Sequence, residues 1–189
     1  GAALEDVTKE AERVIAASHS IGMSLDTCTV PGSPKEQRIP AGMAELGLGI
    51  HGEAGVEQVP YSGAKQAIEA VADKLAPAMG EGHFVALLNN LGGVSILEMA
   101  VLASELLKSR IGRQLDLMVG PAAMMTSLAM HGFSVSVLEA DSEQVALLSA
   151  PCGIAAWPGC VKLTAQTILP LPDGLSPIKA LPSAHSATK

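Results

Sequence analysis

Hydrophobic positions recur along the chain with two periods, one typical of amphipathic helices and one typical of strands with a buried face. The helical period occupies residues 4–20, 62–79, 95–108, 120–132 and the segment that follows Asp141. Strand-like segments occupy residues 21–30, 45–51, 56–59, 83–88, 114–119 and 133–138. This order predicts an α/β fold: a two-layer domain with a mixed sheet of about six strands and helices mainly on one face.

Start and stop signals support several of the expected helices. Ser95 precedes Glu98 by three positions, the spacing of a capping box, and Asp141 precedes Gln144 in the same way. Pro121 follows Gly120, which favours the first turn of a helix that ends at Gly132. Residues 83–88 form a continuous apolar run, which is typical of a central strand covered on both faces.

One segment combines the strand period with candidate chemistry. Residues 46–51 alternate aliphatic side chains with two glycines and then His51. Repeated glycine in a strand often marks the close approach of a ligand or another backbone. We therefore expect His51 at or just past a strand end, on the sheet face that the helices leave least covered. A lone histidine is more often structural or superficial, so the pattern alone leaves both interpretations open.

Two further features are candidate ligand contacts. The loop from Asn89 to Gly93 joins a strand to a capped helix, where exposed N–H groups could hold an anion. Tight packing of the helix on the strand explains its glycines equally well. Glu53 could orient the imidazole of His51 or lie on a solvated turn. The candidate ligand contacts are Gly49, Gly52, Glu53, Asn89, Asn90, Gly92 and Gly93.

Composition limits the function classes. The chain has 189 residues, of which 48% are hydrophobic, enough for one good core. Its formal net charge of −7 argues against nucleic-acid binding. No apolar run approaches the ~20 residues of a membrane span, and no signal peptide is visible. Three cysteines without a CxxC motif and five scattered histidines predict no metal site and suit a cytoplasmic protein.

The composition changes after residue 163. Prolines recur there at positions 170, 172, 177 and 182, among serine, alanine and glycine. Such a stretch has little power to form a core. We therefore expect one α/β unit over residues 1–163 and a linker or tail over residues 164–189.

Four blocks of sequence carry a family resemblance. They are residues 27–32, 45–56 with the His-Gly-Glu triplet, 89–93, and Ala156-Trp157-Pro158. In order and spacing they resemble the substrate-binding subunit of dihydroxyacetone (glycerone) kinases, from the first helix to about Val161. The resemblance implies that His51 forms a reversible covalent hemiaminal with the ketone of the substrate.

The chemistry implied for His51 is consistent with first principles. A neutral imidazole nitrogen is a competent nucleophile toward a ketone, and the bond would fix the orientation of a very small substrate. Glycerol carries similar hydroxyls but no carbonyl, so it could not form the adduct. Affinity should fall when decreasing pH protonates the imidazole.

The resemblance also implies partners. The chain matches only the second half of the substrate-binding subunit, with the start of a linker, so we expect it to be inactive alone. The N-terminal half would supply the acid/base groups, and a separate domain would bind ATP and Mg²⁺; a phosphohistidine carrier is the alternative donor. We expect a homodimer. Alternative functions are a kinase for a longer ketose such as erythrulose, or a non-catalytic ketone-binding regulatory paralogue.

Overall fold

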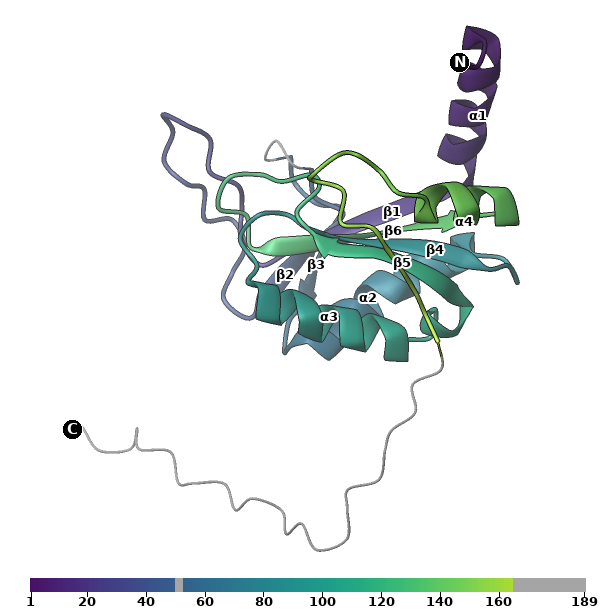
Figure 1. Ribbon diagram of the computed structural model, residues 1–189. Helices are drawn as coiled ribbons and strands as arrows, with labels where there is room; N and C mark the ends of the chain where they lie inside the picture. Colours follow the sequence, from purple (N-terminus) through teal and green to yellow (C-terminus); the bar gives the residue numbers. More distant parts are fainter. Residues whose placement is uncertain (50–52, 165–189) are drawn as a thin grey trace, which may run out of the picture.

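The computed structural model describes residues 1–49 and 53–164, and its centre is one mixed β-sheet (Figure 1). Seven strands in the described residues follow the order β3-β2-β1-β6-β4-β5-β7. Strands β4 and β5 are parallel, and all other neighbours are antiparallel. The strands are β1 (Ser18–Ser24), β2 (Met43–Leu46), β3 (Glu57–Pro60), β4 (Phe84–Asn90), β5 (Leu115–Ala122), β6 (Gly132–Glu139) and β7 (Cys160–Lys162). The predicted α/β class with a mixed sheet is confirmed, and β7 is the strand that the sequence pattern missed.

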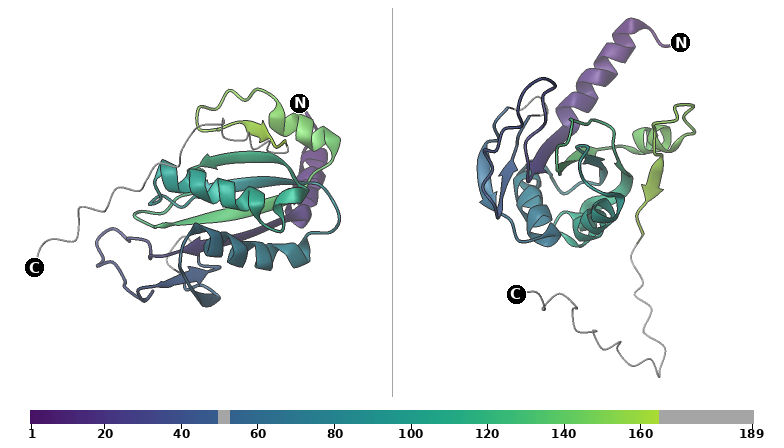
Figure 2. Two further views of the ribbon diagram at one scale, coloured as in Figure 1. Left: turned by 90° about the horizontal axis from the view of Figure 1, so that it is seen from below. Right: turned by 90° about the vertical axis from the view of Figure 1, so that its left-hand side faces the viewer.

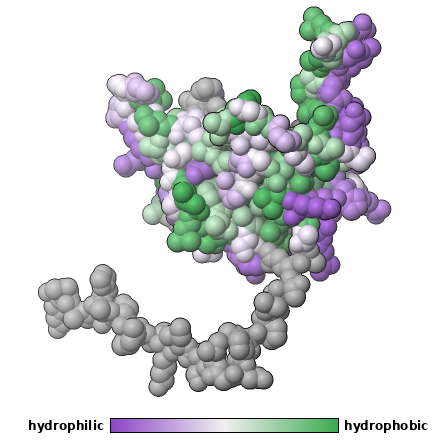
Figure 3. All heavy atoms as spheres, viewed as in Figure 1, coloured by the Kyte–Doolittle hydropathy of each residue, from purple (hydrophilic) through white to green (hydrophobic). Residues whose placement is uncertain are grey.

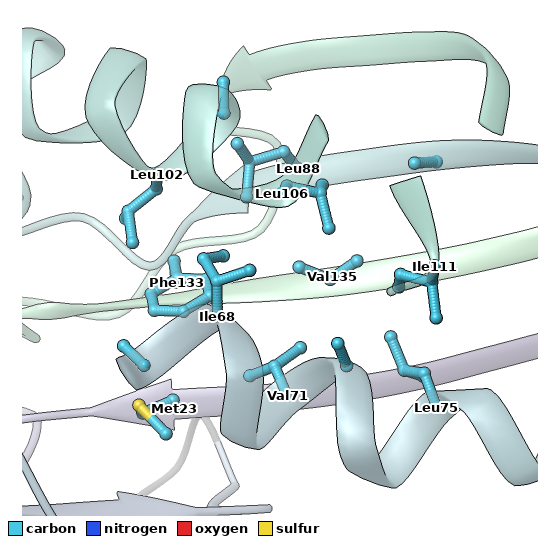
Figure 4. Packing of buried hydrophobic residues seen from close by; sticks show 14 of the residues in the cluster. Met23, Ile68, Val71, Leu75, Leu88, Leu102, Leu106, Ile111, Phe133 and Val135 are labelled. Atoms are coloured by element: carbon cyan, nitrogen blue, oxygen red, sulfur yellow. The ribbon is translucent and has the colours of Figure 1, made fainter. Parts of the chain in front are cut away.

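Helices α2 (Ala64–Leu75) and α3 (Ile96–Lys108) lie side by side on one face of this sheet (Figure 2). Between them and the sheet lies the main core, in which Ile68, Leu106 and Val135 are at most 1% exposed (Figure 4). The short helices η1 (Ala76–Ala78) and η2 (Gly112–Gln114) follow α2 and α3. The core is mostly aliphatic, since only 2% of the residues in the chain are aromatic.

The opposite face of the sheet is covered unevenly. Helix α4 (Ser142–Ser149) and Trp157 pack there over Val85 of β4 and over Leu117 and Val119 of β5. Over β1 and β6 this face carries small side chains instead, and Ser20 and Ser136 are hydrogen-bonded to each other across the two strands. Helix α1 (Leu4–Ala17) has no buried residue and projects from one end of the domain (Figure 1).

The first predicted boundary was wrong by several residues. The helix was expected to reach residue 20 and the strand to occupy residues 21–30, whereas α1 ends at Ala17 and β1 is Ser18–Ser24. All seven residues of β1 pair with β6, from Ser18 opposite Leu138 to Ser24 opposite Gly132. Pairing with a strand distant in sequence therefore decides where this helix ends.

The strand expected over residues 45–51 is also shorter than predicted. Strand β2 is Met43–Leu46, and Gly47 follows with a φ of 72°, a left-handed conformation that glycine adopts without steric cost. Ala44, Glu45 and Leu46 are all buried, so the strand does not simply alternate between a buried and an exposed face. Residues 47–49, over which the period-two pattern continues, thus belong to a loop.

The helix predicted over residues 120–132 is absent, since this described segment contains none. Strand β5 continues through Pro121 to Ala122, and an irregular loop leads to β6. The side-chain oxygen of Asn89 accepts hydrogen bonds from the N–H groups of Met124 and Met125, at 2.8 and 2.9 Å. This tertiary contact holds the backbone where a helix would otherwise begin.

Both predicted capping boxes are confirmed. The Ser95 hydroxyl accepts from the Glu98 N–H at 3.2 Å, and the Glu98 carboxylate accepts from the Ser95 N–H at 2.9 Å. Asp141 and Gln144 make the equivalent pair at α4. The local spacing was sufficient in both cases because each box is formed within one turn of helix.

We expect Ser95→Ala to destabilise the domain by about 1 kcal/mol, because the substitution leaves the Glu98 N–H without its cap. Urea unfolding followed by circular dichroism would measure the change. Ser95→Asp, which keeps an acceptor, should restore most of the loss. Equal midpoints for the alanine variant and the wild type would contradict a stabilising role for this cap.

No helix within residues 1–49 and 53–164 is long and apolar enough to cross a membrane. The segment predicted as a linker or tail, 164–189, lies outside the described residues except for Thr164. The domain boundary after residue 163 therefore stays a prediction.

Candidate functional site

Segments from four parts of the chain converge on one small apolar cluster. Cys28, Leu91 and Met130 are buried there, and Leu48 packs against them. Three of these residues lie in separate blocks of the family resemblance, whereas Met130 belongs to the loop that precedes β6. Residues from the three blocks 27–32, 45–56 and 89–93, which carry the family resemblance, therefore contact one another in the fold.

Residues 47–56, between β2 and β3, form the His51 loop. The structure describes this loop only at its two ends, residues 47–49 and 53–56. Ile50, His51 and Gly52 lie outside the described residues, so the predicted position of His51 and the roles of His51 and Gly52 stay predictions. The ends are held by backbone hydrogen bonds from Gly47 to Gly22, from Val56 to Leu46, and from Gly49 to Glu53. The donor–acceptor distances are 2.7, 2.9 and 3.3 Å respectively. The positions from which the loop departs are thus fixed by β1 and β2.

A largely buried ion pair supports the same loop. The Arg38 guanidinium donates two hydrogen bonds to one Glu45 oxygen, at 2.8 and 3.1 Å, and the Glu45 side chain is only 4% exposed. Arg38 also donates to the backbone oxygen of Glu53 at 3.1 Å. Hydrogen bonding to Glu45 raises the pKa of Arg38 above its ordinary value. Arg38 therefore connects the interior of β2 with the far end of the His51 loop.

Glu53 and Gly49 face each other closely across the base of this loop. A Cβ atom at Gly49 would overlap the Glu53 side chain, with Cδ at 2.7 Å and Cβ at 3.0 Å. Gly49 thus leaves the space into which the Glu53 side chain turns. This contact accounts for the glycine at position 49, and a contact of either residue with a ligand stays a prediction.

Asn89 and Asn90 use their amide groups to shape neighbouring loops. Besides binding Met124 and Met125, buried Asn89 donates to the Met125 carbonyl at 2.9 Å and to the Ser134 hydroxyl at 3.2 Å. The Asn90 amide donates to the Val94 carbonyl at 2.6 Å. Its side-chain oxygen accepts from Gly92 and Val94 at 2.8 and 3.3 Å. Both side chains thus have a structural role.

The glycines of this turn allow a close backbone approach. A Cβ at Gly92 would lie 2.7 Å from the Ser127 carbonyl oxygen, and one at Gly93 would lie 2.7 Å from that of Met130. The Gly93 N–H donates to the Met130 carbonyl at 2.8 Å. Tight packing therefore explains the two glycines, whereas an anion or substrate at this turn stays a prediction.

The described ends of the His51 loop lie beside the sheet face that carries the small residues of β1 and β6. Ile21 and Met23 of β1 contact the main core. Because successive positions of a strand face opposite sides of the sheet, Gly22 between them lies at the opposite face. A Cβ there would lie 3.7 Å from the Ser134 Cβ and 4.0 Å from the Leu48 carbonyl oxygen. Leu48 thus approaches the sheet on the side away from α2 and α3.

Comparisons with known proteins support the family resemblance that the sequence blocks indicated. A family model described as "Dak1 domain" matches residues 1–156. The chain belongs to the Dak1 domain family. It is 32% identical to the dihydroxyacetone kinase of Citrobacter freundii over 185 residues, which are 97% of this chain and 34% of the relative. It is 34% identical to human triokinase/FMN cyclase over 84% of this chain and 29% of that protein.

A third relative is a separate subunit. The dihydroxyacetone-binding subunit DhaK of the PTS-dependent dihydroxyacetone kinase 1 from Listeria innocua is 35% identical, over 83% of this chain and 50% of that protein. The crystal structure of the C. freundii kinase with AMP-PNP and Mg²⁺ superposes with a TM-score of 0.84, covering 97% of this chain and 35% of that one. The Dak1 domain described here therefore spans about a third of the length of the first two relatives.

Sequence reasoning missed two parts of this Dak1 domain site. Arg38 lies in a polar, proline-containing segment in which nothing marks it as a partner of Glu45. Glu45 itself could have been noticed, because a carboxylate among buried strand residues requires a partner. Among the residues that the structure describes, no group of three or more His, Cys, Asp or Glu side chains is arranged to hold a metal ion.

Gly93→Ala should destabilise this Dak1 domain by about 1–3 kcal/mol, because its Cβ would collide with the backbone of Met130 and His131. Thermal or urea unfolding would measure the change. Gly80→Ala is a matched control, since nothing lies within 4 Å of a Cβ at that position. If both variants unfolded at the same midpoint, Gly93 would not be needed for the close approach of these loops.

Proposed function

We propose that the chain is part of a dihydroxyacetone (glycerone) kinase and holds a small hydroxyketone while a primary hydroxyl is phosphorylated. Membership of the Dak1 family and relatives named as dihydroxyacetone kinases support this function. The observation that carries the proposal is the convergence of three family blocks on the cluster of Cys28, Leu48 and Leu91. A scaffold that brings these loops together suits a ligand site in which each loop contributes one wall.

In this proposal His51 is the covalent anchor. Its unprotonated ring nitrogen attacks the ketone carbon, the carbonyl oxygen gains a proton, and the other ring nitrogen loses one. The product is a neutral hemiaminal that retains every atom of the substrate. The adduct holds the primary hydroxyl in one orientation for the phosphoryl donor, which reduces the entropy lost in the transfer step. Arg38 and Glu53 position the loop and are not assigned a chemical step.

The phosphoryl donor is proposed to bind outside this chain. Transfer needs a nucleotide or another phosphate carrier and a metal ion that neutralises the developing charge. The C. freundii kinase structure contains AMP-PNP and Mg²⁺, whereas the L. innocua relative is named as PTS-dependent. The proline-rich stretch after residue 163 favours a linker to an ATP-binding domain. ATP and Mg²⁺ on that domain are thus our first choice, and a phosphohistidine carrier is the second.

Product formation by the complete protein separates a kinase from a non-catalytic ketone binder. Dihydroxyacetone should be phosphorylated when ATP and Mg²⁺ are supplied, and erythrulose is the comparison for a longer ketose. If ATP gives no product, a phosphorylated carrier protein is the second donor to test. Ketone binding without phosphorylation by either donor would contradict the kinase proposal and favour a regulatory role.

We also propose that the protein forms a homodimer, and the exposed face of α1 supports this. Leu4, Val7 and Ile15 are 82, 53 and 73% exposed, which is unusual for one face of a helix in a monomer. Sedimentation should show a dimer for the wild type and a shift toward monomer for Val7→Asp. Ala16→Asp adds the same charge at an exposed position on the opposite side of α1, half a turn about the helix axis from Val7, and should leave the dimer intact. A wild-type monomer at high concentration would contradict this proposal.

A further inference from the structure

A hollow lies on the side of the sheet opposite to the described ends of the His51 loop. It has a volume of about 240 Å³ and is bounded by the first turns of α2 and α3 and by the adjoining ends of β1 and β6. Met23, Leu102 and Phe133 line it from these elements and are at most 6% exposed; they lie close to one another at one end of the main core (Figure 4). Its floor is therefore apolar and held by well-packed residues.

The volume sets the size of a ligand. An apolar cavity of about 150 Å³ accepts a single benzene ring, so a hollow of this size has room for a two-ring aromatic group. Small side chains at Ala64 and Ala67 on α2 leave this space open. Apolar surface also extends over the N-terminal part of α3 beside the opening, where Leu97 is 76% exposed (Figure 3). A bound ring would cover part of this surface.

Polar groups occur mainly at the rim. The Glu98 carboxylate accepts the capping hydrogen bond from the Ser95 N–H, and its other oxygen lies 3.7 Å from the His131 imidazole. The hydrogen bonds at Ser95 lower the pKa of Glu98, so this side chain is a carboxylate at neutral pH. It is about half exposed, at 52%, which leaves it accessible to a ligand entering the hollow.

We propose that this hollow is a second binding site, separate from the His51 site, for a small organic cation that carries an aromatic group of one or two rings. The ring would contact Met23, Leu102 and Phe133, and an ammonium group on a short chain would reach the Glu98 carboxylate at the rim. Apolar burial supplies most of the binding free energy, and the carboxylate selects the charge of the ligand. This site goes beyond the proposed kinase function and does not depend on it.

The proposal can be tested by titrating the protein with three indole compounds that have the same ring system and differ in charge. Tryptamine carries a cation, 3-ethylindole is neutral, and indole-3-propionate is an anion. Titration followed by amide chemical shifts should place tryptamine at residues 94–102 and 131–133. Tryptamine should bind about 1.5- to fivefold more tightly than 3-ethylindole, the range expected for a half-exposed ion pair, and the anion should bind most weakly. Equal affinity of the three probes would overturn the charge selectivity.

Variants separate the two parts of the site. Glu98→Gln keeps the capping box and should remove the preference for tryptamine while 3-ethylindole still binds. Glu105→Gln is the same substitution on the same helix, outside the hollow, and should change nothing. Ala64→Leu should fill the hollow and abolish binding of all three probes, with circular dichroism confirming the fold. Probes that bind Ala64→Leu as tightly as the wild type, or that do not bind the wild type, would overturn the proposal.

Discussion

Dihydroxyacetone should add to the protein at one site, and His51→Ala should lose the addition completely. The adduct requires a nucleophilic imidazole beside the ketone, and alanine offers no atom that could form the bond. Mass spectrometry under gentle native ionisation would measure the gain. Glycerol has no carbonyl carbon and should leave both proteins unchanged. Labelling of the wild type should also decrease as falling pH protonates the imidazole.

Two controls distinguish this adduct from other reactions of the ketone. A hemiaminal retains the whole mass of dihydroxyacetone, whereas a lysine Schiff base lacks one water. His83→Ala removes an exposed histidine that pairs with Asp116 at 2.9 Å, outside the proposed site, and should be labelled like the wild type. Equal labelling of His51→Ala and the wild type would remove His51 from the proposed mechanism. It would leave the Dak1 family assignment unchanged, because that assignment rests on sequence.

The parts of the fold that were predicted correctly are those decided by neighbouring residues. The two capping boxes are formed between residues three positions apart, and the spacing of Ser95 and Glu98 was enough to place the start of α3. The apolar run from residue 83 identified β4, because a strand flanked by β5 and β6 needs side chains that suit both covered faces. Local chemistry and periodicity together gave the α/β class.

The errors occurred where distant residues decide the backbone. Asn89 holds Met124, 35 positions away, and so replaces a helix that the Gly120-Pro121 signal favoured. Strand β1 begins at Ser18 because β6 pairs with it there. Such pairings depend on the completed sheet and leave no mark in the local pattern.

In the candidate site, too, the features decided by neighbouring residues were predicted and those decided by distant residues were not. Sequence reasoning found Gly92 and Gly93, but only the structure shows that carbonyl groups of the loop before β6 approach them. The segment 45–56 was recognised from its glycines and histidine, whereas its support by Arg38 was not. The Arg38 guanidinium binds Glu45 in β2 and the backbone of Glu53 in the His51 loop. The candidate chemistry was therefore visible in a local stretch of sequence, whereas the contacts that hold this stretch in place come from a separate segment.

Loss of that support is the second large effect that we expect. Arg38→Met should destabilise the domain by about 3–5 kcal/mol, because it leaves the Glu45 carboxylate buried without a cation. Urea unfolding at neutral pH would measure the change in the free energy of unfolding. Lys74→Met breaks the exposed pair with Glu57, whose side chains are 50 and 47% exposed, and should cost at most about 1 kcal/mol.

The double variant Arg38→Met/Glu45→Leu shows whether the uncompensated charge is the cause. Replacing both partners removes the buried carboxylate, so the double variant should recover much of the stability lost by Arg38→Met alone. Ketone labelling should be reduced both in Arg38→Met and in the double variant, because each lacks the hydrogen bond from Arg38 to the Glu53 backbone, which anchors the His51 loop. Recovery of both stability and labelling would show that Arg38 serves only the charge balance of β2. If Arg38→Met were no less stable than Lys74→Met, the ion pair would be energetically equivalent to a surface contact despite its burial.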